Sequence, residues 1–149
     1  MKGAYILFMI TIKKFEFHST EEITELYSSV GWTAYTDEPD ILIRGIENSL
    51  LTLAAYDGSR LAGLIRAVGD SFTVVFIQDI LVRPEYQRKG IGKTLMKAVL
   101  KKFGNVRQIE LITDAASGAA EFYRAMGFSE NSELGCCGFI YNPRQAPGL

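Results

Sequence analysis

The sequence predicts an α/β (α+β) fold, in which a mixed, mostly antiparallel sheet carries helices on both faces. The middle of the chain has apolar runs joined by a hairpin signal at Asp57-Gly58, which favours antiparallel pairing. In the second half, strand-like and helix-like segments alternate, which favours βα crossovers. The predicted order is therefore β-α-α-β-β-β-α-β-α-β.

Apolar or alternating runs predict six strands. Their expected bounds are 10–17, 49–56, 60–68, 72–82, 109–113 and 138–141. Four helices are predicted between them. A capping box at Ser19–Glu22 begins the first, which Gly31 ends. Pro39 lies in the first turn of the second, which runs from Asp37 towards Asn48.

The third helix is expected at 92–103, with Gly104 as its stop. The fourth is expected at 116–126 and ends at Gly127, after which Phe128 is placed to pack back on the last turn. No repeat or linker divides the chain. We therefore expect one domain over 1–149, with a core at about 10–141, a short N-terminal extension and a frayed C-terminal tail.

Composition excludes several classes of protein. Apolar residues make up 48% of the 149 residues, which argues against disorder, and a net charge of −1 argues against non-specific nucleic-acid binding. The two cysteines, Cys136 and Cys137, are adjacent and His18 is the only histidine, so neither a disulfide framework nor a metal site is expected. The apolar run at 4–10 is too short for a membrane span. A reduced, cytoplasmic setting without a membrane partner is the expectation.

The most informative segment is a polar loop between the strand at 72–82 and the following helix. The first turn of a helix leaves N–H groups unpaired and carries partial positive charge, so it suits an anion. Gly90 and Gly92 lack the Cβ that keeps a phosphate away from those groups. Arg88, Lys89 and Lys93 add positive charge. The segment therefore predicts a phosphate site.

Two known phosphate loops do not fit this segment. Gly92-Lys93-Thr94 matches the end of a Walker A loop, but Gln87 occupies the position of its first glycine. A nucleotide hydrolase would rest on that tripeptide alone. A dinucleotide-binding fingerprint requires a third glycine where Leu95 stands.

A third pattern, Gln/Arg-x-x-Gly-x-Gly/Ala, is met by residues 87–92 after a strand of Ile80-Leu81-Val82-x-Pro type. It resembles the pyrophosphate loop of the GNAT (Gcn5-related) N-acetyltransferase superfamily. Residues 119–128, Ala-x-x-Phe-Tyr-x-x-x-Gly-Phe, resemble the second signature of that family. The order and the strand between the two motifs also fit. One departure is that Ala116 stands where the family often has Asn.

The resemblance implies a sheet of six to seven strands and direct transfer of an acetyl group from acetyl-CoA to an amine, without a metal. Tyr123 would donate to the leaving thiolate, and Asp79 is the candidate base or amine anchor. The resemblance assigns coenzyme A binding to Leu81, Val82, Gln87, Arg88, Lys89, Gly90, Ile91, Gly92, Lys93, Thr94, Phe122 and Tyr123. In a regular strand Gln78 points to the face opposite Asp79.

The acceptor side is expected between the first two helices. Residues 30–35 and Asn48-Ser49 show some resemblance to the plant and cyanobacterial serotonin (arylalkylamine) N-acetyltransferase branch. Trp32 and Tyr35 are the candidates for holding an ammonium group by cation–π contact; the alternative is a tryptophan packed in the core.

A small-molecule amine or a peptide amine is the expected partner. Homodimers are common in the family the motifs resemble. The alternative to an enzyme is a non-catalytic module that binds acyl-CoA, because the loop suits that role equally well.

Overall fold

The computed structural model describes residues 9–145. These form two compact units, residues 9–112 and residues 113–145. The expected N-terminal extension lies mostly in 1–8 and part of the expected tail in 146–149, both outside the described residues. No helix among residues 9–145 has the length and apolar character that crossing a membrane requires.

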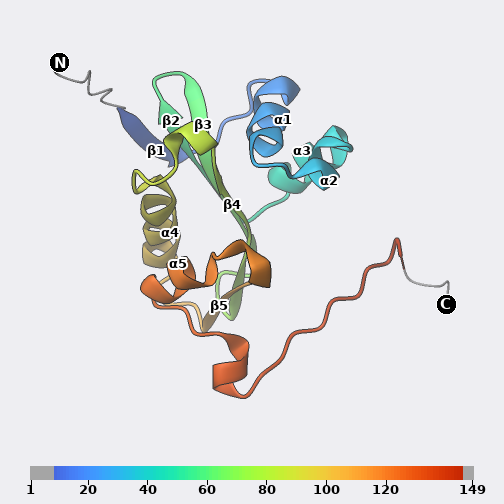
Figure 1. Ribbon diagram of the computed structural model, residues 1–149, viewed down its shortest axis with the longest axis vertical. Helices are drawn as coiled ribbons and strands as arrows, with labels where there is room; N and C mark the ends of the chain where they lie inside the picture. The colour runs from blue at the N-terminus through green and yellow to red at the C-terminus, as the bar shows by residue number, and fades with distance from the viewer. Residues whose placement is uncertain (1–8, 146–149) are drawn as a thin grey trace. The chain divides into compact units, whose positions relative to one another are not determined.

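The first unit is a five-stranded sheet with helices on both faces (Figure 1). Its strands lie in sequence order, β1 to β5. The first four pair antiparallel, and β5 pairs parallel with β4. The strand bounds are β1 Ile10–Lys14, β2 Leu51–Asp57, β3 Arg60–Gly69, β4 Val74–Val82 and β5 Gln108–Leu111.

Helices α1 to α3 cover one face of this sheet and α4 the other (Figure 1). Their bounds are α1 Thr20–Ser29, α2 Thr33–Thr36, α3 Pro39–Glu47 and α4 Ile91–Lys102. Ser19 caps α1 as predicted, with its Oγ accepting from the Glu22 N–H at 3.2 Å. The short α2 was not predicted. Its four residues are too few to show helical periodicity in the sequence.

The apolar core follows the predicted periodicity. On one face Ile23, Leu26 and Tyr27 of α1 pack with residues of β2 to β4. On the α4 side, Leu95, Met96 and Val99 are fully or almost fully buried. Apolar residues at spacings of three and four along each helix produce these buried stripes.

A β-bulge interrupts the pairing of β3 with β4. Arg66 pairs with Asp79, but the next residue, Ala67, pairs with Ile77. Gln78 is therefore the extra residue on β4. A bulge breaks strict alternation, so consecutive side chains can reach the same side of a sheet.

The second unit contains α5 (Ala120–Ala125), which is shorter than predicted because Ala115–Ser117 form a separate 3₁₀ turn and Gly118 adopts a left-handed conformation. The predicted end of this helix is correct. Gly127 has φ +95°, and the Phe128 N–H donates to the Tyr123 carbonyl at 3.0 Å. The rings of Tyr123 and Phe128 lie 6.0 Å apart, as the predicted packing requires.

The predicted strand at 138–141 is wrong. These residues pair with no strand in the described part of the chain, and Phe139 is 91% exposed. Four consecutive residues with strand propensity indicate a local preference for extended backbone, but a strand also requires a neighbouring strand to pair with. The sheet accordingly has five strands among residues 9–145, fewer than the six to seven expected, while the mixed, mostly antiparallel α/β architecture is confirmed.

Candidate active site

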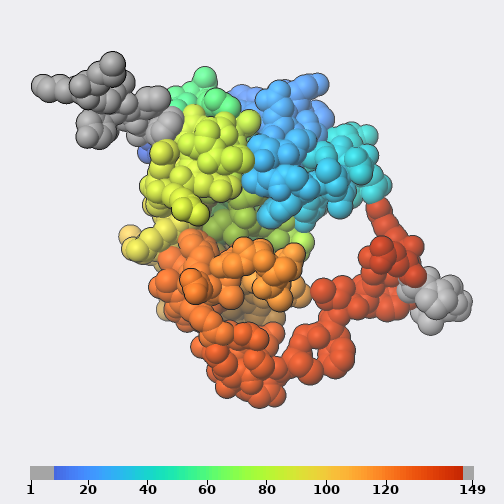
Figure 2. Space-filling model, viewed as in Figure 1, coloured from blue at the N-terminus to red at the C-terminus, as the bar shows by residue number. Residues whose placement is uncertain are grey.

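The loop between β4 and α4 has an unusual backbone. A 3₁₀ turn at Pro84–Tyr86 follows β4, and α4 begins after Gly90. Arg88 and Gly90 both have positive φ, +60° and +81°. Such alternation turns successive N–H groups towards the same side, which is the geometry of an anion-binding concavity. Apart from Tyr86 and Ile91, the side chains of residues 84–91 are exposed, and the loop lies at the surface (yellow-green in Figure 2).

Five amides of the loop and the first turn of α4 have no acceptor within residues 9–145. No hydrogen bond is formed by the N–H groups of the loop and first helical turn at Arg88, Gly90, Ile91, Gly92 and Lys93. The first intrahelical bond runs from the Thr94 N–H to the Gly90 carbonyl at 3.0 Å. The Thr94 hydroxyl donates to the same carbonyl at 2.8 Å, so both bonds hold the first turn of α4.

Three contacts hold the loop in place, and the sequence did not predict them. The Tyr86 hydroxyl donates to Asp57 at 2.7 Å, and Arg60 forms an exposed ion pair with Glu85 at 2.6 Å. The Gln87 amide donates to the Val82 carbonyl at 2.9 Å. Gln87 therefore fixes the turn out of β4. The partners of Tyr86 and Glu85 lie far away in the sequence, so no local pattern signals those two contacts.

Strand β4 has an open edge next to this loop. Its parallel pairing with β5 covers Val74 to Ile77 and ends there. Within residues 9–145, residues 79–82 pair with β3 on one side and with no strand on the other. Backbone N–H and C=O groups on that second edge can therefore pair with an extended ligand. The edge includes Leu81 and Val82, which the sequence predicts to bind coenzyme A.

On the helical face of the sheet, a buried cluster surrounds Asp79. Its carboxylate accepts from the Tyr27 hydroxyl at 2.8 Å and the Tyr35 hydroxyl at 2.7 Å. Arg66 Nε donates to it at 2.7 Å, and the two side chains of this ion pair are 8% and 2% exposed. The structure thus joins the two predicted residues Asp79 and Tyr35, and adds Arg66 and Tyr27, which the sequence did not single out. We call these four residues the Asp79 cluster.

Gln78 also reaches the Asp79 cluster. Its amide donates to the Tyr35 hydroxyl at 3.2 Å. The prediction that Gln78 points away from the side of Asp79 is wrong, because the bulge inserts Gln78 as an extra residue in β4.

Burial and charge shift the pKa values of the cluster. Burial, followed by the charge of Asp79, raises the pKa values of Tyr27 and Tyr35 above the usual value of a phenol. Burial alone lowers the pKa of Arg66, but the Asp79 charge and hydrogen bond more than offset it, so the pKa is raised. Both phenols therefore remain protonated donors at neutral pH, and the guanidinium remains charged.

Trp32 joins this region through aromatic contacts. Its ring lies 5.9 Å from that of Tyr27 and 6.2 Å from that of Tyr35. Trp32 and Tyr35 are both partly buried and pack against the core on the α1–α3 side. The structure therefore brings the two predicted acceptor residues together beside Asp79.

In the second unit, Tyr123 is half-buried on α5. Its ring contacts Phe122 at 5.2 Å, and burial raises the pKa of its hydroxyl, while a hydrogen bond with Thr113 acts in the opposite direction. The phenol therefore stays protonated at neutral pH and can act as a donor. No cluster of three or more His, Cys, Asp or Glu residues within 9–145 is arranged to hold a metal ion.

The fold, the loop at the start of α4 and the open edge of β4 together suit an extended ligand that carries phosphate. Residues 17–128 match the family described as acetyltransferase (GNAT) family. The chain belongs to this family, and it is an acetyltransferase.

Named relatives agree with this assignment. A GNAT family acetyltransferase structure from Streptococcus pneumoniae TIGR4 is 43% identical, has a TM-score of 0.81, and aligns over 92% of this chain and 100% of its own. An uncharacterized ycf52-like N-acetyltransferase of Prochlorococcus marinus is 29% identical over 124 residues, 80% of this chain and 68% of its own. A ycf52 protein of Porphyra purpurea, also named an uncharacterized N-acetyltransferase, is 29% identical over 128 residues, 83% and 71% of the two chains.

Proposed function

We propose that the protein transfers the acetyl group of acetyl-CoA directly to a primary amine, within a ternary complex. The observation that carries this proposal is the set of amides without a hydrogen-bond acceptor among residues 9–145, at the start of α4 and just before it. They belong to Arg88, Gly90, Ile91, Gly92 and Lys93. These amides suit the diphosphate of coenzyme A, since they add their N–H groups to the positive end of the helix dipole. Arg88, Lys89 and Lys93 add positive charge at the rim, and the open β4 edge suits the extended pantetheine arm.

In the reaction, the neutral amine attacks the thioester carbonyl. A C–N bond forms, the C–S bond breaks, and the thiolate leaves with the electron pair. Backbone groups near Leu81 and Val82 are suited to polarise the carbonyl. Tyr123 donates a hydrogen bond to the thiolate, in keeping with its protonated phenol. The nitrogen gives up its proton to a base or to water.

The Asp79 cluster supports a positioning role on the acceptor side. The Asp79 carboxylate is 2% exposed and already accepts three hydrogen bonds. We therefore propose that Asp79 acts through Tyr35, by orienting its hydroxyl, and that Trp32 and Tyr35 contact the amine. This arrangement makes direct proton abstraction by Asp79 the less favoured role.

We also propose that both units belong to one acetyltransferase domain. The family match at 17–128 extends across the boundary between residues 112 and 113, which supports a single functional domain.

The test is release of free thiol from acetyl-CoA in the presence of a panel of arylalkylamines, polyamines and peptide N-termini. Amine-dependent release together with the acetylated amine by mass spectrometry is the expected result. Binding of coenzyme A without turnover on any of these amines would instead support the non-catalytic acyl-CoA-binding alternative.

Substitution of Gly90 tests the phosphate loop. Gly90 has φ +81°, and a side chain at that φ costs about 1–2 kcal/mol in the left-handed region. No atom lies within 4 Å of the position that a Cβ would take, so the cost is one of backbone conformation, not of a clash. We expect Gly90→Val to weaken coenzyme A binding by about tenfold, the equivalent of about 1.4 kcal/mol.

Calorimetric titration of coenzyme A measures this effect, and S-acetylpantetheine provides the control, because it lacks the diphosphate. The ratio of kcat/KM for acetyl-CoA to that for S-acetylpantetheine should fall in the variant. An unchanged ratio would contradict a role of this loop in diphosphate binding.

A further inference from the structure

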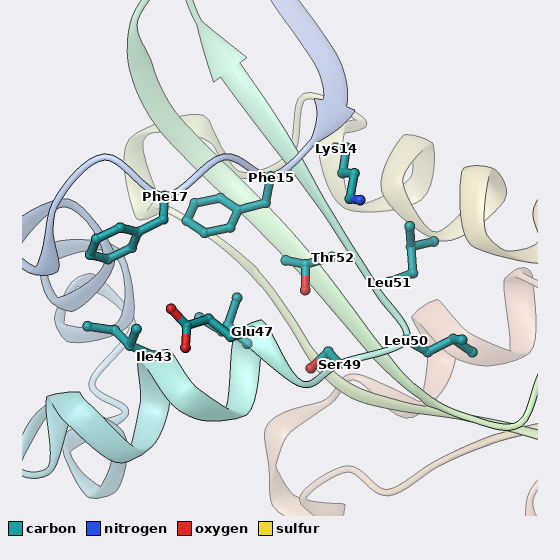
Figure 3. A pocket seen from close by; sticks show the side chains of 10 residues that line it. Lys14, Phe15, Phe17, Ile43, Glu47, Ser49, Leu50, Leu51 and Thr52 are labelled. Carbon is teal, nitrogen blue, oxygen red and sulfur yellow. The ribbon is translucent and has the colours of Figure 1, made fainter.

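A pocket lies on the first unit, apart from the β4–α4 loop. Its walls come from the segment after β1, the C-terminal half of α3 and the start of β2 (Figure 3). The volume is about 220 Å³. A cavity of about 150 Å³ with apolar walls holds benzene, so this pocket has room for a single ring with a small substituent. The lining residues are Lys14, Phe15, Phe17, Ile43, Ile46, Glu47, Ser49, Leu50, Leu51 and Thr52.

Among the lining residues, all within the described part of the chain, only Thr52 has a buried side-chain oxygen without a hydrogen-bond partner. The residue is 7% exposed, and its Oγ1 has no hydrogen-bond partner among residues 9–145. Figure 3 shows this oxygen directed into the pocket. A buried hydroxyl without a partner is unfavourable, so the pocket favours an occupant that can bond to it. Ser49, by contrast, is engaged, since its hydroxyl donates to the Gly45 carbonyl at 2.7 Å and accepts from Arg66 at 3.3 Å.

The charges of the lining favour an uncharged occupant. Lys14 and Glu47 are both exposed and of opposite sign, so their charges offset each other. The remaining walls are aromatic or aliphatic apart from two neutral hydroxyls. A charged group placed against them would lose its hydration without gaining a buried partner of opposite charge.

We propose that this pocket is a binding site for a small, uncharged amphiphile, with a single-ring or branched-alkyl body and one hydrogen-bonding group directed at Thr52. The apolar body packs against Phe15, Ile43 and Ile46, while half-exposed Phe17 forms part of the rim. Ser49 links the wall of the pocket to Arg66 and so to the Asp79 cluster. The proposal is independent of acetyl transfer, because it concerns binding alone.

Phenol is the probe, and toluene is its apolar match without the hydroxyl. Benzoate is the charged comparison. Each is titrated into the full chain labelled with ¹⁵N, and amide shifts are followed by NMR. We expect phenol to cause saturable amide shifts at the residues that line the pocket. Toluene should bind about fivefold more weakly than phenol, because it cannot form the buried hydrogen bond. Benzoate should bind more weakly than phenol.

Thr52→Val removes the hydroxyl at nearly constant volume. It should lower the affinity for phenol about fivefold, to the affinity that the native chain has for toluene. Thr24→Val, in which a helix-bonded hydroxyl on α1 is lost, is the matched control and should bind phenol as the native chain does. Ile43→Trp fills the pocket and should abolish binding of both probes.

The wild-type comparison of phenol with toluene keeps the test valid even where a variant fails to fold. Equal affinities for these two probes would overturn the proposal. So would the absence of saturable shifts up to the solubility limit of phenol, the result expected where water alone meets the Thr52 hydroxyl. Shifts confined to residues outside the pocket, or native phenol affinity in a folded Thr52→Val variant, would overturn it as well.

Discussion

Replacement of Asp79 by leucine is expected to lower the free energy of unfolding by about 3–5 kcal/mol, the range for breaking a buried ion pair from one side. The loss arises because Arg66, whose side chain is 8% exposed, would keep its charge without the carboxylate that balances it. The hydroxyls of Tyr27 and Tyr35 would also lose their acceptor. Equilibrium unfolding in urea, followed by circular dichroism, measures the change.

Two further variants separate this effect from a general sensitivity to lost charge. Glu85→Gln breaks the exposed Arg60–Glu85 pair and should cost at most about 1 kcal/mol. The double variant Arg66→Met/Asp79→Leu removes both buried charges and should recover part of the stability lost in Asp79→Leu. A double variant less stable than Asp79→Leu would contradict this account of the cluster.

The Asp79 cluster also shows where prediction from the sequence reached its limit. The sequence predicts Asp79 from its place on a strand that leads into the loop, and Tyr35 from an aromatic segment. Arg66 gave no comparable signal, because an arginine within an apolar strand is recognisable as buried only when its partner is known. Gly45 on α3 is equally uninformative alone, yet a Cβ there would lie 3.3 Å from the Arg66 guanidinium.

Local signals predicted the helix ends more accurately than the strand pairing. The Ser19 cap and the Gly127 stop depend on residues within one turn, and the structure has both. The bulge at Gln78 depends on how β3 and β4 pair, which alternation within a single strand cannot report. The wrong strand at 138–141 has the same cause, since nothing in a four-residue run indicates a neighbour.

The phosphate loop is predictable for a different reason. Its glycines and basic residues are consecutive, so one short segment contains the positive-φ position, the charges and the helix start. The contacts that hold it, Tyr86 with Asp57 and Arg60 with Glu85, join it to the two strands of the β2–β3 hairpin. A sequence motif therefore identified the loop but not the contacts that fix its position.

Substitution of Tyr123 by phenylalanine is expected to lower kcat by about a hundredfold, within the range for loss of a positioned proton donor. The change removes only the hydroxyl. The ring contacts with Phe122 at 5.2 Å and Phe128 at 6.0 Å do not require it, so the fold and the KM for acetyl-CoA should change little. Tyr141→Phe, at an exposed position outside α5, is the matched control and should retain the native kcat.

The pH profile separates a donor role from a packing role. Burial raises the pKa of Tyr123 above about 10, the ordinary value of a phenol. The protonated form is the active one, so its contribution to kcat is complete below that pH and is lost as the pH rises through the raised pKa. The native enzyme should therefore lose activity on an alkaline limb that Tyr123→Phe lacks. An unchanged kcat in Tyr123→Phe, or the same alkaline limb in both proteins, would exclude the phenol as the donor to the departing thiolate.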